Sequence, residues 1–173
     1  MRTQNLFLIG PMGAGKTTVG KQLAEYFHME FIDSDHEIQR RTGVDIPTIF
    51  EFEGESGFRQ REGTVIDELT ARDGVVLATG GGVIMGEENR KLLSARGVVI
   101  YLYCSVSQQY ERTHRDKNRP LLNTPDPMAR LNELMLVRDP LYRQTADMVV
   151  STEGRNTHSV VQDIRKSLDK LRQ

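Results

Sequence analysis

A glycine-rich stretch close to the start of the chain constrains its fold more than any other feature. Residues 10–17 read Gly-Pro-Met-Gly-Ala-Gly-Lys-Thr, which fits the phosphate-binding pattern of Gly, any four residues, and then Gly-Lys-Ser/Thr. In such a loop the glycines let backbone N–H groups surround phosphate oxygens, the lysine adds a positive charge, and the hydroxyl binds Mg²⁺. The stretch therefore predicts a nucleoside triphosphate site, with Lys16 and Thr17 in the last two roles.

The segments on either side of this loop support the prediction. Residues 6–9 form a short apolar run typical of a strand, and residues 18–27 carry Val19, Leu23 and Phe27 at helical spacing. Strand, glycine turn and helix are the setting that the pattern requires. The N-terminus of the helix adds unpaired N–H groups and partial positive charge, so a triphosphate needs no cage of basic side chains.

Length and composition limit the classes of protein to consider. A chain of 173 residues is long enough for one well-packed domain and short for two, so we predict a single domain over residues 1–173. Its 38% hydrophobic and 27% charged residues are ordinary for a globular protein. Lys+Arg 23 against Asp+Glu 24 leaves a net charge of −1, so no bulk charge favours nucleic acid or a membrane as a partner.

Cys104 is the only cysteine, so no internal disulfide can form and the pattern suits a reducing compartment. It follows the apolar run at residues 98–103, where we expect a buried, inert side chain. No apolar run approaches the ~20 residues that span a bilayer, and the N-terminus lacks a signal-peptide core. We therefore expect a cytoplasmic protein.

Apolar, strand-like runs alternate with helical stretches along the chain. This βα rhythm is typical of a parallel sheet covered on both faces, so the predicted fold class is α/β. The runs lie at residues 6–9, 31–32, 75–78, 98–103 and 148–150.

Two regions interrupt this rhythm, and a last helix follows it. Residues 37–71 are mostly helical with no strand, and residues 112–127 are polar and contain prolines. We interpret these regions as a substrate flap and a lid. Residues 158–171 have apolar side chains spaced for one face and predict a final packing helix.

Two carboxylates follow the short strand at residues 31–32. Asp33 and Asp35 should emerge at its carboxyl end, where open α/β sheets bind ligands. A functional interpretation assigns Asp33 to the Mg²⁺ shell and Asp35 to an acceptor hydroxyl. The structural alternative is a capping box of Ser34 and Glu37, in which the acids merely favour a helix N-terminus. Such a terminus would keep Asp35 ionised, as a good hydrogen-bond acceptor but a weak proton acceptor.

The apolar run at residues 75–78 leads into Thr79 and then three consecutive glycines, Gly80 to Gly82. These glycines leave only backbone facing the crevice, which would let a ligand approach closely. A flexible turn is equally compatible with them. No Asn-Lys-x-Asp base-reading motif is present, and no strand ends in a Walker B aspartate unless Asp33 fills that place. GTPase and motor functions are therefore disfavoured.

Arg59, Arg119 and Arg138 are candidates for binding an anion, because arginine recognises carboxylate and phosphate with two parallel hydrogen bonds. Each of them alone is more typical of a solvated surface residue. Arg59 would then simply pair with Glu62 one turn on, and the basic run at residues 112–119 would be a solvated loop.

Taken in order, these motifs resemble those of the shikimate kinase family over nearly the whole chain, although beyond Val150 the match is looser. The motifs are the loop at residues 10–17, Asp33-Ser34-Asp35, Gly57-Phe58-Arg59 with Glu62, Ala78 to Gly82, Arg119-Pro120-Leu121-Leu122, and Arg138 with Pro140-Leu141-Tyr142. The resemblance implies an enzyme of chorismate and aromatic amino-acid biosynthesis that transfers the γ-phosphoryl group of ATP to the 3-hydroxyl of shikimate.

The resemblance also implies a three-layer αβα kinase fold of the nucleoside-monophosphate-kinase type. Its central parallel sheet would have five strands in the order 2-3-1-4-5, with a helical substrate-binding region at about residues 33–62 and a lid at about 112–127.

Individual roles follow from the resemblance as well. ATP contacts are implied for Gly13, Ala14, Gly15, Lys16, Thr17, Thr18 and Arg119, with Arg155 near the base, and Mg²⁺ contacts for Thr17 and Asp33. Shikimate contacts are implied for Asp35 at the hydroxyls, Arg59 and Arg138 at the carboxylate, and the backbone of Gly81 and Gly82. Lys16, Asp35 and Arg119 would be the catalytic residues.

Two other functions compete with this one. Another small-molecule kinase of the same fold, such as a gluconate kinase, would share the phosphate loop, although the paired arginines favour a carboxylate substrate. A non-catalytic nucleotide-dependent switch would need the loop but not Asp35, Arg59 or Arg138. We expect a monomer whose partner is the small-molecule substrate.

Overall fold

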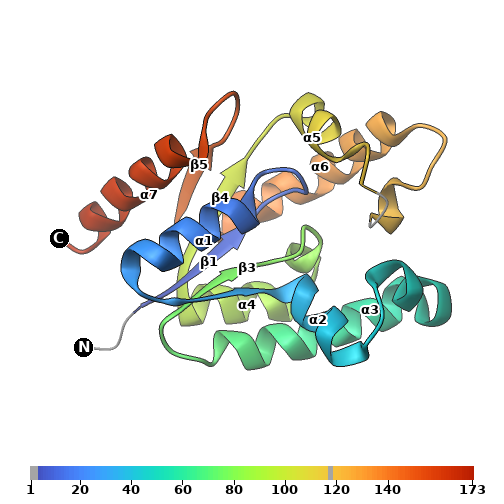
Figure 1. Ribbon diagram of the computed structural model, residues 1–173, viewed down its shortest axis with the longest axis horizontal. Coiled ribbons are helices and arrows are strands. Elements are labelled where there is room, and N and C mark those ends of the chain that lie inside the picture. The colour runs from blue at the N-terminus through green and yellow to red at the C-terminus, as the bar shows by residue number, and fades with distance from the viewer. Residues whose placement is uncertain (1–3, 117–118) are drawn as a thin grey trace.

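The computed structural model describes residues 4–116 and 119–173. Residues 1–3 of the predicted domain and residues 117–118 of the predicted lid lie outside the described residues. One parallel sheet of five strands in the order β2-β3-β1-β4-β5 crosses the molecule (Figure 1), so the predicted fold class and strand order are confirmed. The strands are β1 (Asn5–Ile9), β2 (Glu30–Asp33), β3 (Val75–Ala78), β4 (Gly97–Tyr103) and β5 (Met148–Ser151).

The central strand β1 divides the core into two layers. Leu6 and Leu8 belong to a cluster with residues of α1 (Lys16–Phe27) and α7 (Thr157–Leu171). Phe7 and Ile9 belong to a second cluster, on the opposite face of the sheet. Because successive side chains of a strand point to opposite faces, an uninterrupted apolar run buries both faces and produces the three-layer architecture.

The second face is covered by α4 (Glu87–Arg96) and by the later parts of α3 (Ile46–Thr70) and α6 (Pro127–Thr145). The short 3₁₀ helix η1 (Val83–Met85) lies between β3 and α4. The expected helices at residues 18–27 and 158–171 are confirmed as α1 and α7, each beginning slightly earlier than predicted.

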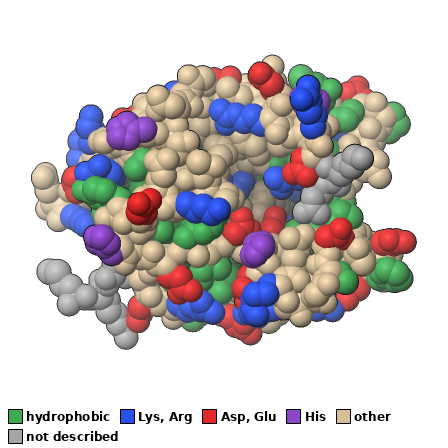
Figure 2. Space-filling view, viewed as in Figure 1, with side chains coloured by type: hydrophobic (Ala, Val, Ile, Leu, Met, Phe, Trp, Pro, Cys, Tyr) green, Lys and Arg blue, Asp and Glu red, His purple; other side chains and the backbone are tan. Residues whose placement is uncertain are grey.

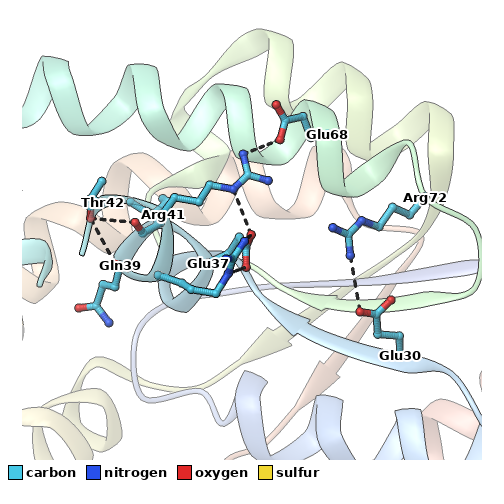
Figure 3. Close-up of polar contacts among 9 residues, drawn as sticks. Glu30, Glu37, Gln39, Arg41, Thr42, Glu68 and Arg72 are labelled. Carbon is cyan, nitrogen blue, oxygen red and sulfur yellow. Dashed lines mark hydrogen bonds and ion pairs between the residues drawn. The ribbon is translucent and has the colours of Figure 1, made fainter. Parts of the chain in front are cut away.

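The predicted helical region after β2 is also confirmed, and it contains two helices. These are α2 (Ser34–Thr42) and α3, and Gly54 interrupts α3 with a φ of 72°. Arg41 of α2 forms ion pairs with Glu37 on its own helix and with Glu68 on α3, and Arg72 pairs with Glu30 at 3.5 Å (Figure 3). Charged contacts on the outer surface thus join α2 to the long helix beside it.

The predicted lid lies between α5 (Val106–Thr113) and α6, and its described part contains the 3₁₀ helix η2 (Pro120–Leu122). In Figure 1 this segment and the first turns of α3 lie on opposite sides of the carboxyl edge of the sheet. Within residues 4–116 and 119–173, no helix combines the length and apolarity needed to cross a membrane.

Candidate active site

The phosphate loop between β1 and α1 has glycines where side chains would be strained or would collide. Gly13 and Gly15 have φ values of 81° and 91°, which favour glycine. At Gly10 φ is 147°, and a Cβ placed there would lie 2.4 Å from the carbonyl oxygen of Leu102 in β4. The backbone conformation and the close approach of β4 therefore require glycine at these positions even without a bound ligand.

Lys16, the first residue of α1, reaches back over this loop. Its Nζ donates to the carbonyl oxygens of Gly10 at 2.6 Å and Pro11 at 2.8 Å. Burial, followed by the charge of Arg119, lowers the pKa of Lys16 to about 8, while Asp35 acts in the opposite direction. An ammonium has three donors, so these two contacts leave the group able to bind a phosphate oxygen as well.

Thr17 and Asp33 meet at the carboxyl end of β2. The Thr17 hydroxyl donates to Asp33 Oδ2 at 3.0 Å. Mg²⁺ prefers hard oxygen ligands and is commonly held by one or two carboxylates together with substrate phosphates. In the described part of the chain no group of three or more His, Cys, Asp or Glu side chains could hold a metal by itself. These oxygens therefore fit a Mg²⁺ ion that shares its ligands with a bound nucleotide.

The capping box of Ser34 and Glu37, the structural alternative, is not formed, although a helix does begin at Ser34. Asp33 caps α2, because its Oδ1 accepts the N–H of His36 at 3.1 Å. The Ser34 hydroxyl instead accepts the N–H of Gly80 at 3.1 Å, and Glu37 pairs with arginines one turn further along α2. Ser34 thus joins the end of β2 to the glycine segment after β3.

Asp35 lies in the first turn of α2, and its Oδ1 is buried with no hydrogen-bond partner among the described residues. Burial, followed by the charge of Asp33, raises the pKa of Asp35, against the lowering effects of Arg119 and Lys16. The expectation that Asp35 is a weak proton acceptor is therefore wrong, because burial disfavours its ionised form.

The glycine segment after β3 makes room for charged side chains of the protein. A Cβ on Gly80 would lie 2.5 Å from Asp35 Oδ1, and one on Gly82 would lie 2.2 Å from Arg59 Nη2. At Gly81 the nearest side-chain atom is Arg138 Nη1, at 3.6 Å. Gly80 and Gly82 thus let Asp35 of α2 and Arg59 of α3 approach closely, which a merely flexible turn would not explain, whereas a Cβ on Gly81 would meet Arg138 only at ordinary contact distance.

Arg59 pairs with Glu62, as one interpretation of the sequence proposed, but the pair is not a surface contact. Arg59 Nη1 donates to Glu62 Oε1 at 2.8 Å, and the Glu62 side chain is only 1% exposed. Glu62 Oε2 is buried without a hydrogen-bond partner in the described chain. Burial raises the pKa of Glu62 to about 7, although Arg59 acts to lower it.

Arg138 lies on α6 and is 5% exposed, so the interpretation of it as a solvated helix-face charge is wrong. Burial lowers the pKa of Arg138. Burying a guanidinium costs free energy unless an anion pairs with it, so Arg138 favours binding of an anionic ligand.

One cavity brings these groups together at the carboxyl edge of the sheet. Figure 2 shows a hollow on this face of the molecule where acidic and basic side chains gather. The charged residues that line the cavity are Asp35, Arg59, Glu62, Arg119 and Arg138, and the apolar ones include Phe50, Phe58 and Leu121.

A second hollow connects this cavity to the phosphate loop. It is lined by Lys16, Thr17 and Asp33, and it shares Asp35 and Arg119 with the first. Arg119 comes from the predicted lid, where its Nε lies 3.1 Å from Asp116 Oδ2. The phosphate loop and the cavity of converging charges therefore form one continuous cleft at the carboxyl edge of the sheet.

A third hollow lies on the other side of the phosphate loop and includes Gly13, Thr18, Arg112 and Arg155. Arg155 is held by α7, since its Nη2 donates to Asp163 Oδ2 at 2.7 Å. Arg112 donates to the carbonyl oxygen of Gly13 at 2.7 Å and was not singled out from the sequence. Its only signal there was the basic run at residues 112–119.

Cys104 follows β4 and is completely buried, as predicted. Burial raises the pKa of its thiol to about 11, so the reactive thiolate is disfavoured at neutral pH.

Comparisons with known proteins agree with this geometry. The sequence model of the shikimate kinase family matches residues 12–169. A shikimate kinase of Methylococcus capsulatus is 59% identical over 96% of this chain and 93% of its own, and one of Halorhodospira halophila is 60% identical over 94% and 92%.

Solved structures give the same result. The shikimate kinase of Acinetobacter baumannii in complex with shikimate has a TM-score of 0.95 at 52% identity, covering 97% of this chain and 94% of that one. A gluconokinase of Sinorhizobium meliloti has a TM-score of 0.60 at 16% identity over 97% and 93% of the two chains, which shows a shared fold alone. By its sequence over nearly its full length and by its structure, this chain belongs to the shikimate kinase family.

Proposed function

We propose that this chain transfers the γ-phosphoryl group of ATP to the 3-hydroxyl of shikimate, giving shikimate 3-phosphate and ADP. The observation that carries the proposal is the continuous cleft in which Lys16 of the phosphate loop is followed by Asp35 and then by two buried or half-buried arginines, Arg59 and Arg138. A hydroxylated carboxylic acid needs this combination of a carboxylate acceptor and guanidinium donors.

At the ATP end, the backbone of residues 13–18 surrounds the phosphates and Lys16 neutralises charge that develops during transfer. Thr17 and Asp33 would hold Mg²⁺, whose charge neutralises the phosphate oxygens of ATP. Arg112 and Arg155 bound the hollow into which the base extends, since both line it beside the phosphate loop.

At the acceptor end, Arg59 and Arg138 bind the carboxylate of shikimate, and Gly81 and Gly82 contribute backbone contacts. Asp35 accepts a hydrogen bond from the acceptor hydroxyl and directs its oxygen toward the γ-phosphorus. The new oxygen–phosphorus bond forms as the bond to the β-phosphate oxygen breaks, the hydroxyl proton passes to Asp35 and from there to solvent, and ADP leaves. Placement of both reactants in one cleft supplies most of the acceleration in such a reaction.

Arg119 acts from the lid. Its charge is close enough to lower the pKa of Lys16, so the two cations converge where the transferring phosphate would lie. A lid that closes over both substrates excludes water, which would otherwise accept the phosphoryl group.

We also propose that residues 1–173 form a single domain, with its substrate-binding region at about residues 33–62 and its lid at about 112–127. A monomer in the cytoplasm that binds neither nucleic acid nor membrane suits a net charge of −1 and a small substrate.

A panel of acceptors tests the proposed function. The purified chain is given ATP and Mg²⁺, and ADP release is followed with shikimate, gluconate or a nucleoside monophosphate. We expect rapid turnover with shikimate alone, which Asp35→Asn abolishes and Asp169→Asn, on the exposed face of α7, leaves unchanged. Turnover with gluconate but not shikimate would contradict the proposal, as would a native rate for Asp35→Asn.

A further inference from the structure

Tyr142 is a buried polar side chain at the acceptor end of the cleft to which the mechanism gives no role. It is completely buried on α6, one turn after Arg138 on the same side of the helix. Its ring packs on that of Tyr101 in β4, with ring centres 4.8 Å apart.

The phenol group of Tyr142 joins two parts of the acceptor site. It donates a hydrogen bond to the carbonyl oxygen of Gly81 at 2.5 Å. Burial raises the pKa of this phenol, and the charge and hydrogen bond of Arg138 act in the opposite direction. Because a phenol is both a donor and an acceptor, it can hold Gly81 and Arg138 at the same time.

The contact with Gly81 also orients the next peptide group. The Gly81–Gly82 peptide is trans, so the Gly82 N–H points away from the Gly81 carbonyl and hence away from Tyr142. Both glycines line the cavity of the acceptor site. Rotation of this peptide would redirect the Gly82 N–H and break the hydrogen bond to Tyr142.

The ring beneath Tyr142 is itself held in place, but by groups outside the cavity. The hydroxyl of Tyr101 donates to Asp139 Oδ1 at 2.6 Å, and Asp139 pairs with Arg143 at 3.0 Å. Tyr101 therefore offers a close comparison: it is equally buried, it is in the same ring stack, and its hydroxyl binds neither Gly81 nor Arg138.

We propose that Tyr142 is a positioning residue for the acceptor carboxylate, which fixes the Gly81–Gly82 peptide and the Arg138 guanidinium through its single hydroxyl. The proposal rests on the proposed function, because it assumes that a carboxylate binds between these groups.

The test compares Tyr142→Phe with Tyr101→Phe, since each removes one buried hydroxyl and keeps the ring. Steady-state kinetics gives KM for shikimate and for ATP, and titration calorimetry gives the Kd of each. For Tyr142→Phe we expect KM and Kd for shikimate to rise roughly five- to ten-fold, the effect of one lost hydrogen bond of about 1 kcal/mol or slightly more. The values for ATP should stay within about two-fold, as should all values for Tyr101→Phe.

Thermal melting of the three proteins sets the assay temperature well below the lowest midpoint, so unfolding cannot imitate weak binding. Native shikimate affinity in Tyr142→Phe would overturn the positioning role, and so would an equal rise in Tyr101→Phe or an equal loss of ATP affinity. If the unaltered protein does not phosphorylate shikimate, the proposed function and this inference both fail. If it does, and Tyr142→Phe still binds shikimate with native affinity, only this inference fails.

Discussion

The two ends of the cleft are built in different ways. The phosphate end is one contiguous segment, residues 10–17, whose glycines, lysine and threonine are proposed to contact the nucleotide directly from their places in the loop. The acceptor end is assembled from α2, α3 and α6 around the glycines that follow β3. The phosphate end can be predicted from a short sequence motif, whereas the acceptor end depends on contacts between segments that are distant in the sequence.

The phosphate end should respond most strongly to a single change. Lys16→Met removes the charge that neutralises the transferring phosphate, so we expect kcat to fall roughly a thousand-fold. Circular dichroism and melting should show a folded protein. Lys91→Met, on the exposed face of α4, is the control and should keep native kcat. A Lys16→Met enzyme with native kcat would show that the loop does not act as assigned.

A substitution at the acceptor end should weaken shikimate binding more than it lowers kcat. Arg138→Lys keeps the charge but loses the planar fork, so we expect KM for shikimate to rise roughly thirty-fold, with KM for ATP unchanged. Arg143→Lys, on the exposed side of the same helix, is the matched control. If Arg138→Lys keeps native KM for shikimate, another group must hold the carboxylate.

Glu62 makes the acceptor end sensitive to pH. Its pKa of about 7 in the folded protein lies above its ordinary value of 4.5, so the folded state favours the protonated carboxyl, which faces Arg59, Arg138 and Asp35. The resulting stabilisation is complete below about pH 4.5 and is lost as the pH rises through 7.

Glu62→Gln imitates the protonated form of this carboxyl. Denaturant unfolding should give similar free energies for both proteins at pH 5 and a more stable variant at pH 8, by on the order of 1–2 kcal/mol. Parallel stability curves across this range would show that Glu62 does not titrate in this way.

The smallest effect should come from the glycine segment. A Cβ at Gly82 would lie 2.2 Å from Arg59 Nη2 and must displace that guanidinium. We expect Gly82→Ala to raise KM for shikimate about five-fold with little change in melting, because a side-chain end moves more easily than backbone. At Gly63 a Cβ meets no atom closer than 3.8 Å, so Gly63→Ala should keep native KM. Equal KM values in both variants would remove the steric role of Gly82.

The sequence was sufficient for the elements that depend on local pattern. The apolar runs predicted all five strands: β1, β3 and β4 are buried and read as continuous hydrophobic segments, and the edge strands β2 and β5 still carry two and three consecutive apolar residues. The same local reasoning failed at Ser34, whose hydroxyl binds Gly80, forty-six residues away in the chain. It also misjudged the pKa of Asp35, because burial there comes from the fold and not from neighbouring residues.

Arg112 and Glu62 illustrate the same limit within the site. Arg112 contacts Gly13, ninety-nine residues away, and nothing next to Arg112 in the sequence indicates that contact. Glu62 was recognised as a partner of Arg59, but its burial became visible only when α3 was placed against the sheet.

The central claim is that ATP and a hydroxylated carboxylic acid meet in this one cleft. A crystal structure of the chain with ADP and shikimate tests it most directly. We predict shikimate with its carboxylate between Arg59 and Arg138 and a hydroxyl on Asp35, facing the ADP phosphates on the loop at residues 10–17. Shikimate bound elsewhere, or with its carboxylate away from both arginines, would contradict the account.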